Sequence, residues 1–118
     1  CIGETLKERR TKKTNHILKR QIEKGLKSIN NKSKIIIAYE PVWSIGTGVV
    51  PKEAALIQTI SFIKSRFVKN YPKILYGGSV NTNNADKLKK IPNIDGFLIG
   101  GASQNPKKFI DIIKKTII

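Results

Sequence analysis

The sequence KIIIAYEPVWSIGTG, residues 34–48, contains an apolar run that passes directly into an acid, a proline and a loop with two glycines. Its first part, residues 34–39, is typical of a strand buried in a parallel sheet, because it is short and nearly continuously apolar. Glu40 follows this run, and Pro41 stops the strand from continuing. Ligands of parallel α/β proteins bind beyond the carboxyl ends of the strands, so this stretch indicates both a fold class and a place for chemistry.

The rest of the chain alternates helix-like and strand-like segments. Apolar residues at helical spacing predict helices over residues 14–30, 51–68, 83–90 and 106–115. In the second of these, Leu56, Ile60, Ile63 and Phe67 are predicted to form one apolar stripe. Further short apolar runs predict strands over residues 73–76 and 95–99, and residues 1–2 are expected to end another strand. Such alternation predicts an α/β fold with right-handed crossovers and a parallel sheet covered by helices. About four units are half of a closed eight-unit barrel, so we expect that part of the protein is missing from this chain or that a partner supplies it.

The charge of the chain raises the question of a nucleic-acid partner. The sequence of 118 residues has 23 lysines and arginines against 8 aspartates and glutamates, a formal net charge of +15. The basic residues are spread over every predicted helix and do not alternate with aromatic side chains, as they do in single-strand binders. We therefore expect no nucleic-acid partner, although the positive field can attract anionic metabolites.

The composition also indicates where the protein works. No run of about 18 apolar residues is present, so we expect no membrane contact. A single cysteine cannot form an internal disulfide bond, which favours a reducing cytoplasm. The length is that of one domain, and no flexible linker divides the chain.

Two glycine pairs follow the next two predicted strands, in YGGSV (residues 76–80) and IGGAS (residues 99–103). Consecutive free backbone N–H groups before a helical turn form an anion site, and Ser79 and Ser103 could add hydroxyl donors. The alternative is that the glycines only allow tight turns. Two such pairs at successive strand ends favour a phosphate site, whereas the nucleotide motifs GxxxxGK[ST] and GxGxxG are not present.

Glu40 is the strongest candidate for a catalytic residue. A carboxylate at the mouth of a sheet is partly desolvated, which makes it a stronger base than a free glutamate. The alternative is a structural carboxylate paired with a lysine. The loop after it could close over a polar pocket, with Trp43 and Ile45 as its apolar surface, although a tryptophan alone is more often a packing residue.

Four motifs in order make a specific resemblance: CIGETL (residues 1–6), AYEPVWSIGTG (residues 38–48), YGGSV (residues 76–80) and DGFLIGGAS (residues 95–103). Together they resemble the second half of the triosephosphate isomerases. The resemblance implies a (βα)8 TIM barrel, of which this chain covers the end of strand 5 through helix 8. Residues 1–118 are then the C-terminal portion of a single barrel domain.

The resemblance also implies roles for residues of the site. Glu40 is the base that moves a proton between adjacent carbons of dihydroxyacetone phosphate and glyceraldehyde 3-phosphate, through an enediol intermediate, in glycolysis and gluconeogenesis. The residues implied to bind the substrate phosphate are Gly46, Ser79, Gly100 and Gly101. The implied lid consists of Pro41, Val42, Trp43, Ser44, Ile45, Gly46, Thr47 and Gly48. Tyr76 and Ser79 are implied to latch the closed lid, while Glu4 and Arg9 are implied to give structural support.

The resemblance implies no metal and no organic cofactor, and a homodimer for the complete protein. The other catalytic groups of the family, an Asn-x-Lys and a histidine, have no counterpart here, and His16 is expected at the surface. We therefore expect the 118 residues alone to be inactive. Two alternatives stay open: a non-catalytic, basic half-barrel that binds anions or nucleic acid, and a split-gene subunit that needs an N-terminal half. Retention of Glu40 with both glycine pairs favours an isomerase.

Overall fold

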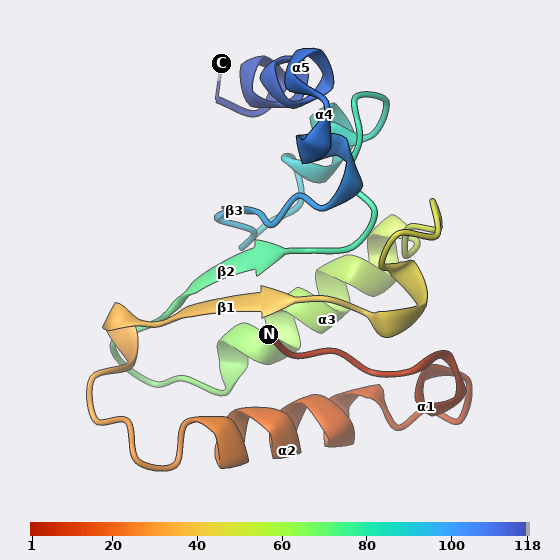
Figure 1. Ribbon diagram of the computed structural model, residues 1–118. Helices are drawn as coiled ribbons and strands as arrows, with labels where there is room; N and C mark the ends of the chain where they lie inside the picture. The colour runs from red at the N-terminus through yellow and green to blue at the C-terminus, as the bar shows by residue number, and fades with distance from the viewer. Residues whose placement is uncertain (118) are drawn as a thin grey trace.

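The fold is built on a three-stranded parallel sheet with the strand order β1-β2-β3 (Figure 1). A computed structural model describes residues 1–117. The strands are β1 (Ile36–Tyr39), β2 (Lys73–Tyr76) and β3 (Gly96–Phe97). The carboxyl ends of all three strands therefore lie at the same edge of the sheet.

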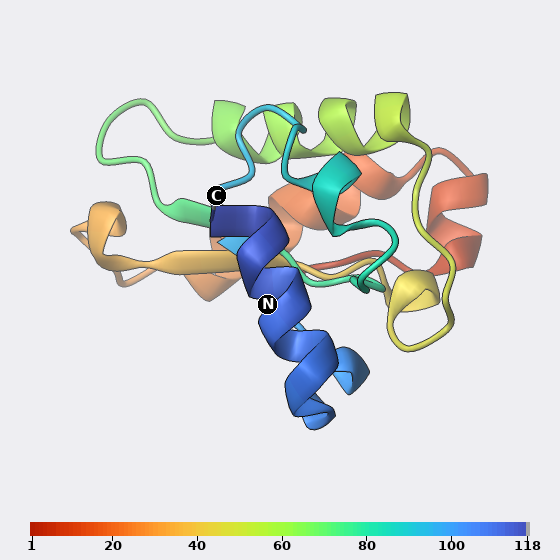
Figure 2. The same cartoon turned by 90° about the horizontal axis from the view of Figure 1, so that it is seen from above.

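Two helices precede β1, and one α-helix follows each strand in the chain. They are α1 (Leu6–Arg10), α2 (Thr14–Gly25), α3 (Glu53–Ser65), α4 (Ala85–Leu88) and α5 (Pro106–Ile117), with 3-10 turns η1 (Lys32–Lys34), η2 (Val42–Ser44) and η3 (Gly101–Gln104). Figures 1 and 2 show α3 running alongside β1 and β2, with α2 beyond β1 and α5 beyond β3. Within residues 1–117, no helix has the length and hydropathy needed to cross a bilayer.

The core lies between the sheet and α3. Leu56, Ile60 and Ile63 form the predicted apolar stripe of α3 and have 0% exposed surface. They pack in one cluster with side chains of β1 and β2, such as Tyr39 and Ile74. This packing confirms the stripe, because positions four and three residues apart lie on one helical face.

Several predicted boundaries were wrong by a few residues. The helix predicted over residues 14–30 ends at Gly25, because glycine is a poor helix former. The helix predicted over residues 51–68 spans only Glu53–Ser65, the one over 83–90 only Ala85–Leu88, and the one over 106–115 extends to Ile117.

The predicted strand over residues 73–76 is confirmed, whereas the other two are shorter than predicted. The run over residues 34–39 forms a strand only from Ile36. The run over residues 95–99 forms only the two-residue strand β3, which pairs with β2 and, within residues 1–117, has no strand on its other side. The carboxylate of Asp95 accepts a hydrogen bond from the Ile74 N–H at 2.8 Å, next to the point where the ladder begins.

The short helix α1 was not predicted. It has no buried residue, so it carries no apolar stripe that a periodicity search could find. It is stabilised instead by a capping box, in which Thr5 Oγ1 accepts from the Glu8 N–H at 3.2 Å and the Glu8 carboxylate accepts from the Thr5 N–H at 2.9 Å. The backbone hydrogen bond from Thr5 holds the pKa of Glu8 below its ordinary value. The T-x-x-E spacing of residues 5–8 was the signal that could have predicted this helix.

Residues 1–3 run beside β1, as expected for the end of a further strand. Ile2 forms a parallel bridge with Tyr39, and the Glu40 N–H donates to the Ile2 carbonyl oxygen at 2.8 Å. Gly3 lies so close to the next turn that a Cβ atom there would be 1.8 Å from the carbonyl oxygen of Glu40. Only glycine fits at this position, because the neighbouring atom is backbone.

We predict that Gly3→Ala lowers the free energy of unfolding by about 3 kcal/mol, since the added methyl group must separate residues 1–3 from β1. Gly25→Ala is the matched control. A Cβ atom at Gly25 meets nothing within 4 Å, so this change should be neutral or stabilise by about 0.5 kcal/mol. Urea denaturation of both variants measures the difference, and equal stabilities would contradict the close contact.

Candidate active site

An open cavity of about 680 Å³ lies at the carboxyl ends of the three strands. Glu40 after β1, Gly77 and Gly78 after β2, and Gly100 and Gly101 after β3 all line it. Ile45, Gly46 and Gly48 of the loop after Glu40 form another part of its wall, together with Ser79. The structure thus brings one acid and both glycine pairs to a single cavity.

Glu40 lies directly against the first glycine pair. A Cβ atom at Gly77 would be 2.5 Å from Glu40 Cγ and 2.7 Å from Glu40 Oε1, so glycine is required for the acid to occupy this place. Within residues 1–117, the Glu40 carboxylate has neither an ion-pair nor a hydrogen-bond partner. The alternative of a lysine-paired structural carboxylate therefore finds no support among these residues, and the carboxylate is available to accept a proton.

The loop over residues 41–48 begins with the 3-10 turn η2 and ends with two glycines. Gly46 and Gly48 have φ angles of +65° and +77°, which other residues rarely adopt. Ile45 lines the cavity and is 49% exposed. Trp43 does not line it; its ring lies 5.4 Å from the guanidinium carbon of Arg9. Of the two apolar side chains expected at the loop surface, only Ile45 is in position to cover the cavity.

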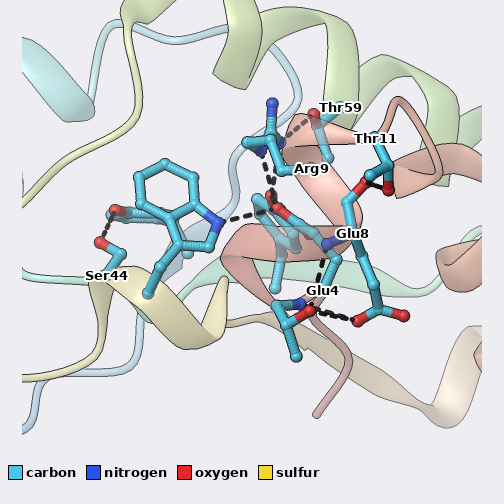
Figure 3. A network of polar contacts seen from close by, with 10 residues as sticks. Glu4, Glu8, Arg9, Thr11, Ser44 and Thr59 are labelled. Carbon is cyan, nitrogen blue, oxygen red and sulfur yellow. Dashed lines mark hydrogen bonds and ion pairs between the residues drawn. The ribbon is translucent and has the colours of Figure 1, made fainter.

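A buried acid, Glu4, holds the base of the loop (Figure 3). Its carboxylate accepts from Arg9 Nε at 2.9 Å, from the Tyr39 hydroxyl at 3.0 Å and from the Trp43 indole N–H at 3.1 Å. Arg9 also donates to Thr59 Oγ1 of α3 at 3.2 Å. Burial, followed by the charge of Glu4, raises the pKa of Tyr39, so its phenol stays a neutral donor. This network connects the loop to β1 and α3, and it agrees with the structural role expected for Glu4 and Arg9.

The two residues expected to latch the loop both contact it. Tyr76 at the end of β2 forms a hydrogen bond of 3.1 Å with Ser44 Oγ, and burial raises the pKa of this tyrosine. Ser79 Oγ donates to the Ser44 carbonyl oxygen at 2.6 Å and accepts from the Gly48 N–H at 2.9 Å. The segment after β2 is therefore bonded to both ends of the loop.

The second glycine pair begins the turn η3. Within residues 1–117, the backbone N–H groups of Gly46, Gly100 and Gly101 donate to no protein acceptor. Ser103 does not contribute as expected, because its hydroxyl donates to the Gly100 carbonyl oxygen at 2.6 Å and it does not line the cavity. Lys108 of α5 does line the cavity, although no motif in the sequence indicated a role for this lysine. The cavity wall thus offers free N–H donors and one cationic side chain, a combination that suits an anion.

Residues 1–117 contain no candidate metal site. Among residues 1–117, no group of three or more His, Cys, Asp or Glu side chains could hold a metal ion. His16 lies in α2, is exposed and does not line the cavity.

A second cavity of about 640 Å³ lies between residues 1–2, α2 and β1. Its walls include Ile17, Arg20 and Leu26, and no glycine pair meets an acid there. Of these two cavities, only the one at Glu40 combines an acid with both glycine pairs.

Comparison with known proteins agrees with this geometry. Residues 1–116 match the family model described as triosephosphate isomerase. The chain is 47% identical over 120 residues to a triosephosphate isomerase of Thermodesulfovibrio yellowstonii, covering 97% of this chain and 49% of that protein. It is 46% identical to the enzyme of Mycoplasma mobile, over 97% of this chain and 47% of that protein, and 43% identical to that of Candida albicans, over 99% and 50%. The chain spans about half the length of the curated relatives that it matches.

We predict that Glu4→Gln lowers the free energy of unfolding by about 2 kcal/mol, because a buried charge-assisted hydrogen bond to Arg9 is lost. The control is Glu23→Gln, which removes an exposed ion pair with Lys19 and should change stability by less than about 0.5 kcal/mol. Urea denaturation followed by the fluorescence of Trp43 measures both. Equal effects would show that the network does not stabilise the base of the loop.

Proposed function

The chain belongs to the triosephosphate isomerase family, and from this premise we propose that it forms the C-terminal half of an enzyme that interconverts dihydroxyacetone phosphate and D-glyceraldehyde 3-phosphate. The reaction would serve glycolysis and gluconeogenesis in the cytoplasm. The observation that carries the proposal is that Glu40, without a partner among residues 1–117, lines one cavity with both glycine pairs. Residues 1–118 would be the C-terminal portion of one TIM-barrel domain.

Glu40 is proposed as the catalytic base. Its carboxylate would take a proton from C1 of dihydroxyacetone phosphate, which leaves an enediol intermediate, and would return the proton to C2. One side chain can do both because the two carbons are adjacent. The contact between Glu40 and Gly77 supports this role, since it holds the carboxylate at the cavity wall.

The phosphate of the substrate is proposed to bind opposite this base. Free N–H groups of Gly46, Gly100 and Gly101 line the cavity and can each donate a hydrogen bond to a phosphate oxygen. Ser79 lines the same cavity, but its hydroxyl and its N–H donate to Ser44 in the structure, so a bond from Ser79 to the phosphate would require one of these two bonds to break. The net charge of +15 adds a favourable field for a phosphorylated substrate.

The loop over residues 41–48 is proposed as the lid. With Ile45 at the cavity wall, closure would exclude water from the enediol intermediate, which otherwise loses its phosphate. Gly46 and Gly48 would let the far end of the lid move, while Pro41 and Trp43 keep its base stiff. Tyr76 and Ser79 would latch the closed lid.

The remaining catalytic groups are proposed to come from an N-terminal half. A lysine and a histidine there would stabilise the oxygen charge that develops as Glu40 removes the proton, and each such donor is worth several kcal/mol, or about 10²–10³ in turnover. The 118 residues alone should therefore show negligible turnover. A homodimer is proposed for the complete protein.

A second candidate is an anion-binding half-barrel without turnover, and a third is a split-gene subunit. The free N–H groups and the positive charge suit both. The three candidates differ in what an added N-terminal half does: it restores isomerase activity to a fused or split enzyme, and gives no activity to a binding module.

The test joins residues 1–118 to the N-terminal half of the Thermodesulfovibrio yellowstonii relative, and we call this protein the joined barrel. We expect it to isomerise D-glyceraldehyde 3-phosphate, and the 118-residue chain to be inactive, in a coupled assay. The same N-terminal half added as a separate chain tests the split-gene alternative. A folded joined barrel that binds phosphate but does not isomerise would favour the binding module.

The role of Glu40 is tested by Glu40→Asp in the joined barrel. The shorter side chain withdraws the carboxylate by about one bond length, so kcat should fall by about 10²-fold. The dissociation constant for inorganic phosphate should change by less than twofold, because the glycine N–H groups are untouched. Glu23→Asp on the exposed face of α2 is the matched control. Normal turnover in Glu40→Asp would refute the assignment.

A further inference from the structure

Ser44 is a buried serine in the middle of the proposed lid, with 0% exposed surface. The resemblance assigned the latch to Tyr76 and Ser79 and gave no role to the Ser44 hydroxyl. In the structure this hydroxyl contacts the Val49 carbonyl oxygen, the Tyr76 hydroxyl at 3.1 Å and the Ser79 N–H at 3.3 Å. One hydroxyl therefore contacts Val49, directly after the lid, and two residues at the carboxyl end of β2, Tyr76 and Ser79.

The direction of each hydrogen bond follows from simple counting. A hydroxyl has one hydrogen to donate, and the Val49 carbonyl oxygen can only accept, so Ser44 donates to Val49. Tyr76 must then donate its own hydrogen to Ser44 Oγ. Burial raises the pKa of Tyr76, which keeps this hydrogen in place. The Ser79 N–H is a second donor to the same oxygen.

Ser79 makes the reciprocal contacts. Its hydroxyl donates to the Ser44 carbonyl oxygen at 2.6 Å and accepts from the Gly48 N–H at 2.9 Å. We call the pair Ser44 and Ser79 the serine clamp. Through Ser79 it bonds the near side of the glycine turn at Ser44 and the far side at Gly48 to the segment that follows β2, and through Ser44 it bonds Val49.

Gly78 makes room for the clamp. A Cβ atom at this position would lie 2.0 Å from the Tyr76 hydroxyl oxygen and 2.5 Å from Ser44 Oγ. The second glycine of the YGGSV motif is thus needed for the tyrosine and the serine to meet, in addition to any contact with a ligand.

We propose that Ser44 is a positioning residue of the isomerase, whose hydroxyl joins Tyr76 to the far end of the lid and so holds Ile45 and Gly46 at the cavity wall. The inference rests on the proposed function. Replacing Ser44 by alanine would leave the buried Tyr76 hydroxyl without its partner, and the carbonyl oxygen of the exposed Val49 would lose its hydrogen bond to the lid. The lid would then spend less time over the cavity, while Glu40 and the N–H groups after β3 would be unchanged.

The first test is Ser44→Ala in the joined barrel. We expect kcat/KM for D-glyceraldehyde 3-phosphate to fall by about tenfold, the effect of one unsatisfied buried polar group. The fraction of turnovers that release inorganic phosphate should rise, because an uncovered enediol intermediate eliminates phosphate. A merely structural loss of active protein would lower the rate without changing that fraction. An unchanged fraction or an unchanged kcat/KM overturns the proposal.

The matched control is Ser65→Ala. Ser65 also donates through its hydroxyl to a backbone carbonyl oxygen, that of Phe62 at 2.6 Å, but it is exposed and lies at the end of α3, far from the lid in the chain. It should leave both readouts unchanged. A rise in phosphate release in Ser65→Ala would show that the readout reflects general stability and would overturn the interpretation.

A double-mutant cycle tests whether Ser44 acts through Tyr76. Tyr76→Phe should change both readouts in the same direction as Ser44→Ala, by a smaller amount, because the bond to Val49 remains. The double variant should be no worse than Ser44→Ala within about twofold, since both changes remove one shared bond. Additive effects would overturn the shared role. If Ser44→Ala does not fold by far-UV circular dichroism, Tyr76→Phe alone carries the test of phosphate release.

Amide hydrogen exchange gives a readout that does not depend on activity. In the 118-residue chain and in the joined barrel, Ser44→Ala should speed exchange at Gly48 by about tenfold, although Ser44 Oγ does not bond this N–H. Exchange in α3 should stay unchanged. Unchanged exchange at Gly48 overturns the positioning role. A joined barrel without isomerase activity, by contrast, would refute the proposed function. Hydrogen exchange at Gly48 would then still show whether Ser44 holds the lid in place.

Discussion

The close approach of Glu40 to two glycines is the constraint on which the rest of the site depends. Gly3 meets its carbonyl oxygen on one side, and Gly77 meets its side chain on the other. Backbone hydrogen bonds set this spacing, because the Glu40 N–H donates to Ile2 and the Gly77 N–H donates to Tyr39. The parallel register of residues 1–3, β1 and β2 therefore fixes where the acid lies. Any side chain larger than hydrogen at either glycine would move it.

The loop after Glu40 combines a fixed base with an exposed tip, and the difference has a physical origin. At the base, the buried carboxylate of Glu4 has three hydrogen-bond donors, so its charge is compensated and Trp43 is held in place. At the tip, Ile45 to Gly48 are exposed, and both glycines have positive φ angles. The serine clamp spans the two parts. Movement of such a loop requires breaking a few hydrogen bonds and leaves the core of β1, β2 and α3 intact.

Much of the fold could be predicted from sequence, and the errors share causes. The strand over residues 73–76 and the stripe Leu56, Ile60 and Ile63 were predicted because burial imposes a pattern on the sequence. Helix α1 was missed because local hydrogen bonds, without burial, stabilise it.

In the site, the positions of the strand ends predicted that Glu40 and the glycine pairs would lie at one edge of the sheet. The partners of Ser44 could not be predicted, because a hydroxyl suits many acceptors and two of its three partners lie 32 and 35 residues away. Ser103 was expected to donate into the cavity, but its hydroxyl donates to the backbone carbonyl oxygen of Gly100, three residues earlier.

The position of Glu40 also bears on the choice between an enzyme and a binding module. A cavity with free N–H groups and Lys108 attracts an anion. A carboxylate in the same wall repels that anion, and the repulsion is strongest where water is excluded. For a protein that only holds phosphate or nucleic acid, this acid weakens binding and has no compensating use, since no cation among residues 1–117 pairs with it. For the proposed proton transfer, the same arrangement would place an unpaired carboxylate next to a phosphorylated substrate. An enzyme gains a faster chemical step in return for weaker binding, whereas a binding module gains nothing. The position of Glu40 therefore favours an enzyme.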